Sequence, residues 1–246
     1  MRLRFLFLIS ICGLACLVPA LGRDAAVRPD LDVARLQTGS FRYRNLEAGK
    51  EAGQGLIQIR RVPNSQNYQF SNSISGVFAQ SWQTVASEDF SPLSAKLTFG
   101  EGMDVRPAFE LAYQNGRVTG LSFPRKGQEP AEPRRVDEAI AADTVDQRID
   151  WAAVMALKEY TPGEKFEFHV FDPGTGHSRL RAEVGETTIT TVPAGSFETI
   201  HVTYHIEKNR GTETYEVFFT KRAPRFQVRE KFPDGSVGDL LEQNNH

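Results

Sequence analysis

Two histidines four residues apart, His201 and His205, are the first side chains whose spacing could do chemistry. On a helix this spacing places two imidazoles side by side, as zinc sites require. The neighbouring residues alternate between apolar and polar, which indicates a strand, and four residues of strand span roughly 13 Å. We therefore expect two polar-face residues there and no metal. His169 and His177 flank a turn that could bring them together, yet we expect no metal at this pair either.

The acidic residues are the next candidates, because paired carboxylates act as acid and base when their environments separate their pKa values. We expect these acids to form a solvated face at a helix start instead, where the helix dipole favours negative charge. They are Asp137, Glu138, Asp143, Asp146 and Asp150.

Signatures of nucleophilic catalysis or phosphate binding are missing from the sequence. There is no Gly-x-Ser-x-Gly motif, and Gly174-Thr175-Gly176 is too short for a phosphate loop. We predict no catalytic residue, no cofactor and no enzyme activity. The open alternative is an envelope hydrolase or modifying enzyme that uses the acids or histidines.

Aromatic residues are the remaining candidates for a site. The chain contains 17 Phe, 6 Tyr and 2 Trp, spread over nearly every predicted strand. A filled core is one interpretation, and a concave sheet or open barrel that holds an apolar ligand is the other. The first candidates for such a lining are Tyr68, Phe70, Val77, Phe78 and Trp82. Sequence does not distinguish a filled interior from a hollow one.

The N-terminus has the features of an export signal. Arg2 and Arg4 precede an apolar run over residues 5–18, and Ala20 and Gly22 supply the small residues that a signal peptidase reads. The run is shorter than the roughly 20 residues that span a bilayer, and no other stretch is long and apolar. We expect cleavage near Gly22, a periplasmic location, and no transmembrane helix in the mature chain.

Cys16 offers an alternative, since lipidation at the weak lipobox that ends there would anchor the protein to a membrane. Otherwise both cysteines, Cys12 and Cys16, leave with the signal, and neither disulfide nor thiolate chemistry is available. The mature chain then has 27 basic residues against 31 acidic ones, a net charge of −4. That charge argues against a nucleic-acid partner.

Most of the mature chain shows the period-two alternation of half-buried strands, for example over residues 68–75, 93–99 and 200–206. Asn115-Gly116 is a strong two-residue hairpin signal, and Pro233-Asp234-Gly235-Ser236 predicts another turn. Half-apolar strands of this kind are typical of antiparallel sheets with one face in water.

One helix is expected near residues 143–160, which lack Gly and Pro until Pro162 and carry apolar residues at helical spacing. Residues 125–136 are polar and contain prolines, which indicates a loop between two halves. The predicted organisation is a signal peptide over residues 1–22, a flexible leader over 23–35, and a single β-rich domain over 36–242.

Several motifs in the second half, over residues 146–241, resemble a known family. They include Tyr160-Thr161-Pro162-Gly163-Glu164, Thr191-Val192-Pro193-Ala194-Gly195-Ser196-Phe197, Val217-Phe218-Phe219-Thr220 and Phe232-Pro233-Asp234-Gly235-Ser236-Val237. They resemble the bacterial exported proteins catalogued as domain of unknown function 3108. The family usually has an aspartate-turn-proline run where this chain has Thr220-Lys221-Arg222-Ala223-Pro224.

The resemblance implies a mainly antiparallel sheet curled into a roll or half-open barrel, and it supplies no catalytic residues. Our hypothesis is a non-enzymatic periplasmic protein that binds an apolar small molecule or an envelope protein. A purely structural docking module is the further alternative, and fold alone does not decide between them.

Overall fold

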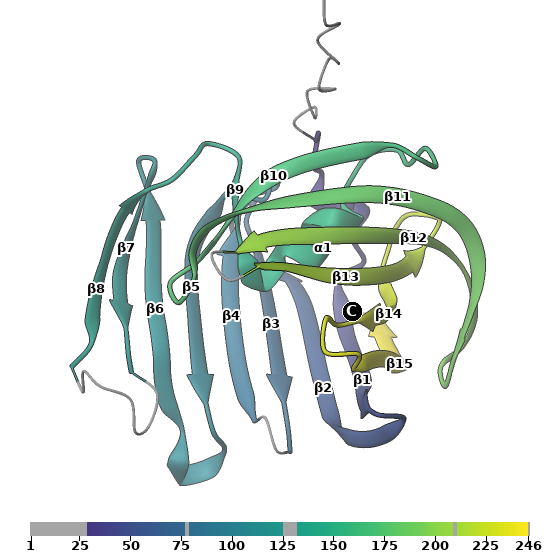
Figure 1. Cartoon of the computed structure of the whole chain (residues 1–246), viewed down its shortest axis with the longest axis horizontal. Coiled ribbons are helices and arrows are strands. Elements are labelled where there is room, and N and C mark those ends of the chain that lie inside the picture. Colours follow the sequence, from purple (N-terminus) through teal and green to yellow (C-terminus); the bar gives the residue numbers. More distant parts are fainter. Residues whose placement is uncertain (1–28, 77–78, 125–131, 209–210, 246) are drawn as a thin grey trace, which may run out of the picture.

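The computed structural model describes residues 29–76, 79–124, 132–208 and 211–245 (Figure 1). The first half consists of eight strands: β1 (Gly39–Glu47), β2 (Lys50–Arg61), β3 (Tyr68–Ile74), β4 (Gln80–Ala86), β5 (Pro92–Phe99), β6 (Arg106–Gln114), β7 (Arg117–Ser122) and β8 (Arg134–Ala139). The second half contains β9 (Thr144–Asp146), α1 (Asp150–Met155), β10 (Lys165–Asp172), β11 (Gly176–Val192), β12 (Gly195–Lys208), β13 (Gly211–Thr220), β14 (Gln227–Lys231) and β15 (Val237–Asn245). Short 3-10 turns cover Val33–Arg35, Gly102–Asp104 and Gln147–Ile149.

In the described residues all strands belong to one sheet, in the order β8-β7-β6-β5-β4-β3-β2-β1-β15-β14-β13-β12-β11-β10-β9. Antiparallel pairing of β1 with β15 joins the two halves, and only β9 and β10 pair in parallel. The order begins at β8 and ends at β9, so the sheet is curled but not closed into a barrel. This confirms the prediction of a sheet curled into a roll or half-open barrel.

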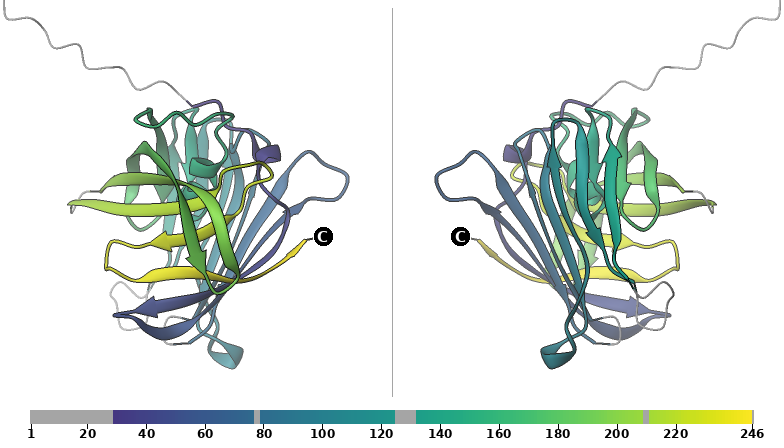
Figure 2. Two further views of the ribbon diagram at one scale, coloured as in Figure 1. Left: turned by 90° about the vertical axis from the view of Figure 1, so that its right-hand side faces the viewer. Right: turned by 90° about the vertical axis from the view of Figure 1, so that its left-hand side faces the viewer.

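The curl brings the two halves face to face. Figure 1 shows β10–β13 running across the strands of the first half, and Figure 2 shows the same arrangement from both sides. Helix α1 lies between the two layers, and all six of its residues are buried. Apolar faces from both halves enclose a main core, in which Phe41 stacks on Phe226 and Phe70 packs against Phe90. A smaller apolar cluster lies around Phe109.

The turns follow the sequence chemistry. Asn115 and Gly116 have φ of 53° and 69° and join β6 to β7, as a two-residue turn with positive φ requires. The turn at Pro233–Ser236 joins β14 to β15. Both predicted hairpins are confirmed.

The structure contains the helix predicted near residues 143–160, but this helix is shorter than predicted. Residues 144–146 form β9 instead, because their backbone pairs with β10, and this tertiary pairing outweighs local helical preference. Asp146 caps the following 3-10 turn by accepting from the amide of Arg148, and α1 ends at Met155.

Two predicted loose segments are ordered where the structure describes them. Val33 is fully buried, and its amide donates to the Glu88 carbonyl at 3.0 Å, so residues 29–35 pack against the domain. Residues 134–136 of the expected loop 125–136 belong to β8, which pairs with β7. The signal residues, with Cys16, Ala20 and Gly22, lie outside the described residues.

Candidate functional site

The histidines on β12 are polar-face residues, as expected. His201 Nε2 lies 3.2 Å from Glu216 Oε2, and its ring stacks on Phe218 with centroids 4.4 Å apart. His205 Nδ1 lies 2.9 Å from Thr214 Oγ1 on the neighbouring strand. Over the described ranges no three His, Cys, Asp or Glu side chains are grouped as a metal site requires.

His169 and His177 each pair with a separate acid rather than with one another. His169 Nδ1 lies 2.8 Å from Asp143 Oδ1, and His177 Nε2 lies 3.2 Å from Glu138 Oε2. Glu138 belongs to the edge strand β8 and His177 to β11, so this pair links the two ends of the open sheet through side chains. Asp143 directly precedes β9, which pairs with the strand of His169, so the second pair stays within one end of the sheet.

The aromatic side chains proposed as a ligand lining lie in the packed core. Phe70 is fully buried, Tyr68 and Trp82 are each 8% exposed, and all three belong to the main apolar cluster. Val77 and Phe78 lie outside the described residues. Tyr68, Phe70 and Trp82 pack against other core residues. None of them lines the open groove beside the β1–β2 and β14–β15 turns.

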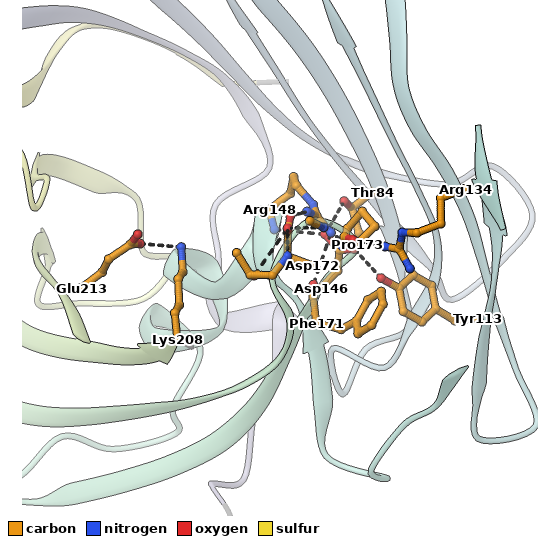
Figure 3. A network of polar contacts seen from close by, with 12 residues as sticks. Thr84, Tyr113, Arg134, Asp146, Arg148, Phe171, Asp172, Pro173, Lys208 and Glu213 are labelled. Atoms are coloured by element: carbon orange, nitrogen blue, oxygen red, sulfur yellow. Dashed lines mark hydrogen bonds and ion pairs between the residues drawn. The ribbon is translucent and has the colours of Figure 1, made fainter. Parts of the chain in front are cut away.

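The expectation of a solvated acidic face is wrong for Asp146, which is completely buried in a polar network (Figure 3). Arg148 binds it through two contacts, Nε to Oδ1 at 2.6 Å and Nη2 to Oδ2 at 2.5 Å. The Tyr113 hydroxyl also donates to Asp146, at 2.6 Å, and that of Thr84 at 3.3 Å. Arg148 Nη1 reaches Asp172 at 2.5 Å. Burial opposes the charge of Arg148, but Asp146 and Asp172 outweigh it and raise the pKa of Arg148.

A second polar cluster lies inside the roll, and it too contradicts the expected solvated face. Asp150 is buried in α1, and Glu230 is buried in β14. The Tyr204 hydroxyl donates to Glu230 at 3.3 Å, and Gln227 Nε2 donates to it at 3.0 Å. Burial raises the pKa of Glu230 to about 7, and burial together with the charge of Glu230 raises the pKa of Asp150 well above its usual value.

An open groove lies where strand ends of both halves meet. It has a volume of about 420 Å³, within the range of roughly 300–1,000 Å³ typical of ligand pockets. Its walls come from the β1–β2 hairpin, the end of β3, the start of β13 and the β14–β15 turn. The lining residues are Asn45, Leu46, Glu47, Ala52, Ile74, Ser75, Glu213, Tyr215, Phe232, Pro233, Asp234 and Ser236.

Tyr215 connects the groove to the buried acids. Its ring stacks on Tyr204 with centroids 5.0 Å apart, and its hydroxyl donates to Glu213 at 2.8 Å. Phe232 meets the Tyr215 ring edge-on at 6.3 Å. Burial, then the hydrogen bond to Glu213, then the charge of Asp150 raise the pKa of Tyr215, so this hydroxyl stays protonated.

Few features of the sequence indicate this groove. Its apolar lining residues stand at strand ends beside turns, where Leu46 precedes Ala48-Gly49 and Phe232 precedes Pro233. Apolar residues beside turns are the feature of the sequence from which the groove could have been predicted. Nothing local indicates that the turns of β1–β2 and β14–β15 open into one space.

Comparison with known proteins shows which family this architecture belongs to. The model of the family described as Protein of unknown function (DUF3108) matches residues 40–241. The chain belongs to the DUF3108 family. The predicted resemblance is thereby confirmed, and it extends through the first half as well as over residues 146–241.

No curated protein matches this DUF3108 chain. A β-barrel-like protein of domain of unknown function DUF1849 from Brucella abortus is similar in structure, with 12% identity and a TM-score of 0.52. The similarity covers 87% of this chain and 99% of that one. It extends the shared fold beyond the DUF3108 family.

Two other solved structures have lower scores against the DUF3108 chain. A candidate exported protein with a YmcC-like fold from Bacteroides fragilis has 10% identity and a TM-score of 0.39, over 88% of this chain and 100% of that one. A candidate lipoprotein from Parabacteroides distasonis has 12% identity and a TM-score of 0.34, over 87% and 99%. In the DUF3108 chain itself, none of the described helices is long and apolar enough to cross a membrane.

Proposed function

We propose that this protein is a non-enzymatic component of the bacterial cell envelope that binds an apolar ligand in the open groove. The observation that carries the proposal is the groove itself, with a volume of about 420 Å³ and apolar walls that include Leu46, Ile74, Tyr215 and Phe232. Small-molecule sites are concave and mostly apolar, with a few polar groups that fix orientation.

The groove is built from rigid parts. Its apolar side chains stand on strands that are hydrogen-bonded to neighbours on both sides, or on the tight turn that follows Phe232. The Tyr215 hydroxyl already has an acceptor in Glu213, so the ring can be covered by an apolar ligand without losing a hydrogen bond. A preformed site of this kind loses little conformational entropy on binding.

The envelope location is supported by the N-terminal sequence. Arg2 and Arg4, the apolar run and the small residues Ala20 and Gly22 are the features of an export signal. Fractionation of cells that express the full chain would test this, with a soluble periplasmic form of residues 23–246 as the expected product. A membrane-bound form that is lost with Cys16→Ala would support the lipoprotein alternative.

Ligand binding is tested with N-phenyl-1-naphthylamine, a neutral apolar probe whose fluorescence rises in apolar surroundings. We expect saturable binding to the purified chain. Ala52→Trp places a large side chain into the groove lining and should abolish the signal, whereas Ala139→Trp, on the exposed edge strand β8, should not. Circular dichroism must show that both variants are folded. No binding to the parent chain, or equal binding to Ala52→Trp, would overturn the proposal.

A further inference from the structure

We propose that the groove selects amphiphiles whose polar end is positively charged, such as alkylammonium compounds, over those with an anionic end. This inference rests on the proposed function, because it assigns a chemical class to the ligand of the same groove. Its basis is the sign of the charges that surround the apolar walls.

Among the described residues that line the groove, every charged side chain is an acid. Glu47, Glu213 and Asp234 contribute carboxylates, and in the described part of the chain no lysine or arginine lines the groove. The three acids come from three separate parts of the groove wall, namely the β1–β2 hairpin, the start of β13 and the β14–β15 turn. Low-dielectric walls lined by one sign of charge concentrate the electric field.

Two of these acids are held in the charged form at neutral pH. Hydrogen bonds from the hydroxyl and amide of Ser236 lower the pKa of Asp234. Burial works against the charge of Glu213, but hydrogen bonds from Lys208 and Tyr215 prevail and lower its pKa. The groove therefore keeps its negative charge over the physiological range.

Nearby cations neutralise only part of this charge. Lys208 Nζ lies 2.5 Å from Glu213, so that carboxylate is paired. Lys50 stands opposite Glu47 in the β1–β2 ladder without forming an ion pair with it. In the described parts of the chain neither Glu47 nor Asp234 has an ion-pair partner, which leaves two carboxylates available to a ligand.

The buried acids Asp150 and Glu230 contribute to the same field only in their ionised forms. Burial is the main cause that raises the pKa of the Tyr204 and Tyr215 hydroxyls, and the charges of Asp150 and Glu230 add to this effect. Any ionisation of this pair makes the inner wall of the groove more negative. A carboxylate or phosphate head placed here would meet like charges, whereas an ammonium head would meet opposite ones.

The test compares three amphiphiles with the same twelve-carbon chain as competitors for N-phenyl-1-naphthylamine, each below its micelle concentration. They are dodecyltrimethylammonium, dodecanoate and the neutral dodecyl maltoside. We expect the cation to bind about tenfold or more tightly than the anion, a difference of roughly 1.4 kcal/mol. The preference should shrink at high salt, because the rim carboxylates are exposed and screened.

The double variant Glu47→Gln with Asp234→Asn removes the two unpaired charges and keeps side-chain size, and Asn still accepts hydrogen bonds in the turn. We expect it to lose most of the preference while it retains affinity for the neutral amphiphile. The matched control, Glu183→Gln with Glu207→Gln, removes two exposed charges on β11 and β12 and should change nothing.

The outcomes separate the two proposals. Equal or tighter binding of dodecanoate, with competition by the neutral amphiphile intact, overturns the charge preference and leaves the apolar groove standing. A preference that persists unchanged in the double variant also overturns it, because the charges named would then not be its source. Failure of the probe and of all three amphiphiles to bind overturns both proposals.

Discussion

Arg148 and Asp146 form a two-point ion pair inside the protein, with Nε to Oδ1 at 2.6 Å and Nη2 to Oδ2 at 2.5 Å. Asp146 is fully buried and Arg148 is 9% exposed. Hydroxyl groups from β4 and β6 complete the shell of Asp146, while Arg148 continues to Asp172 at the end of β10. The pair thus ties the first half of the sheet to the second.

Asp146→Asn should destabilise the fold strongly. The change leaves the Arg148 guanidinium buried with only Asp172 to balance it, and breaking a buried pair in this way costs about 3–5 kcal/mol. The midpoint of urea unfolding measures the effect. Glu207→Gln, which breaks the exposed contact with Arg181, should leave the midpoint nearly unchanged. A small effect of Asp146→Asn would mean that the network contributes little to stability.

Tyr113→Phe should cost about 1–3 kcal/mol, because it removes a hydrogen bond to a charged acceptor, 2.6 Å long and buried. The two substitutions should not be additive, since they share the Asp146 carboxyl group. Urea unfolding of the single variants and the double variant completes a double-mutant cycle. Full additivity would contradict the coupling that the geometry implies.

Glu230 should make the protein less stable as pH rises. Burial raises its folded pKa to about 7 from the usual 4.5, so the folded state binds the proton more tightly than the unfolded state. The resulting stability is fully present below 4.5 and is lost as pH rises through about 7. At about 1.4 kcal/mol for each pKa unit, this loss is on the order of 3 kcal/mol.

Glu230→Gln should abolish most of that pH dependence and raise the melting temperature at about pH 8 above that of the parent chain. The new amide can donate to Gln227 Oε1, a buried acceptor that has no hydrogen-bond partner. Thermal unfolding of both chains at about pH 5 and about pH 8 measures this. Parallel losses of stability in the two chains would show that another group is responsible.

Gly120→Ala should destabilise the β6–β7 ladder by about 1–3 kcal/mol or more, the usual cost of overpacking. Gly120 has a φ of 152°, and a Cβ there would stand 2.0 Å from the Glu110 carbonyl oxygen on the paired strand. Gly49→Ala is the control, because Gly49 also has positive φ but an added Cβ would meet nothing within 4 Å. Thermal unfolding should show a clearly larger loss for Gly120→Ala. Equal losses of stability in the two variants would show that backbone strain, and not the contact with the Glu110 carbonyl, is the cause.

Local patterns predicted much of the fold. Alternation of apolar and polar residues predicted the strands, and Asn115-Gly116 predicted its hairpin correctly, because both signals depend only on neighbours in the chain. The helix prediction was too long because residues 144–146 pair with β10, a contact that no local pattern reports. Likewise Asp146 looked like a solvated acid, because the hydroxyl groups of Thr84 and Tyr113 that help to bury it come from distant strands.

The amino-acid sequence by itself determined a β protein with its turns, one helix and the features of an export signal, because periodicity, turn chemistry and hydrophobicity act between near neighbours. Only the tertiary structure decided which polar side chains are buried and where a groove opens. Those outcomes follow from the pairing of β1 with β15 and the curl of one large sheet, which bring together strand ends nearly two hundred residues apart, such as Leu46 and Phe232.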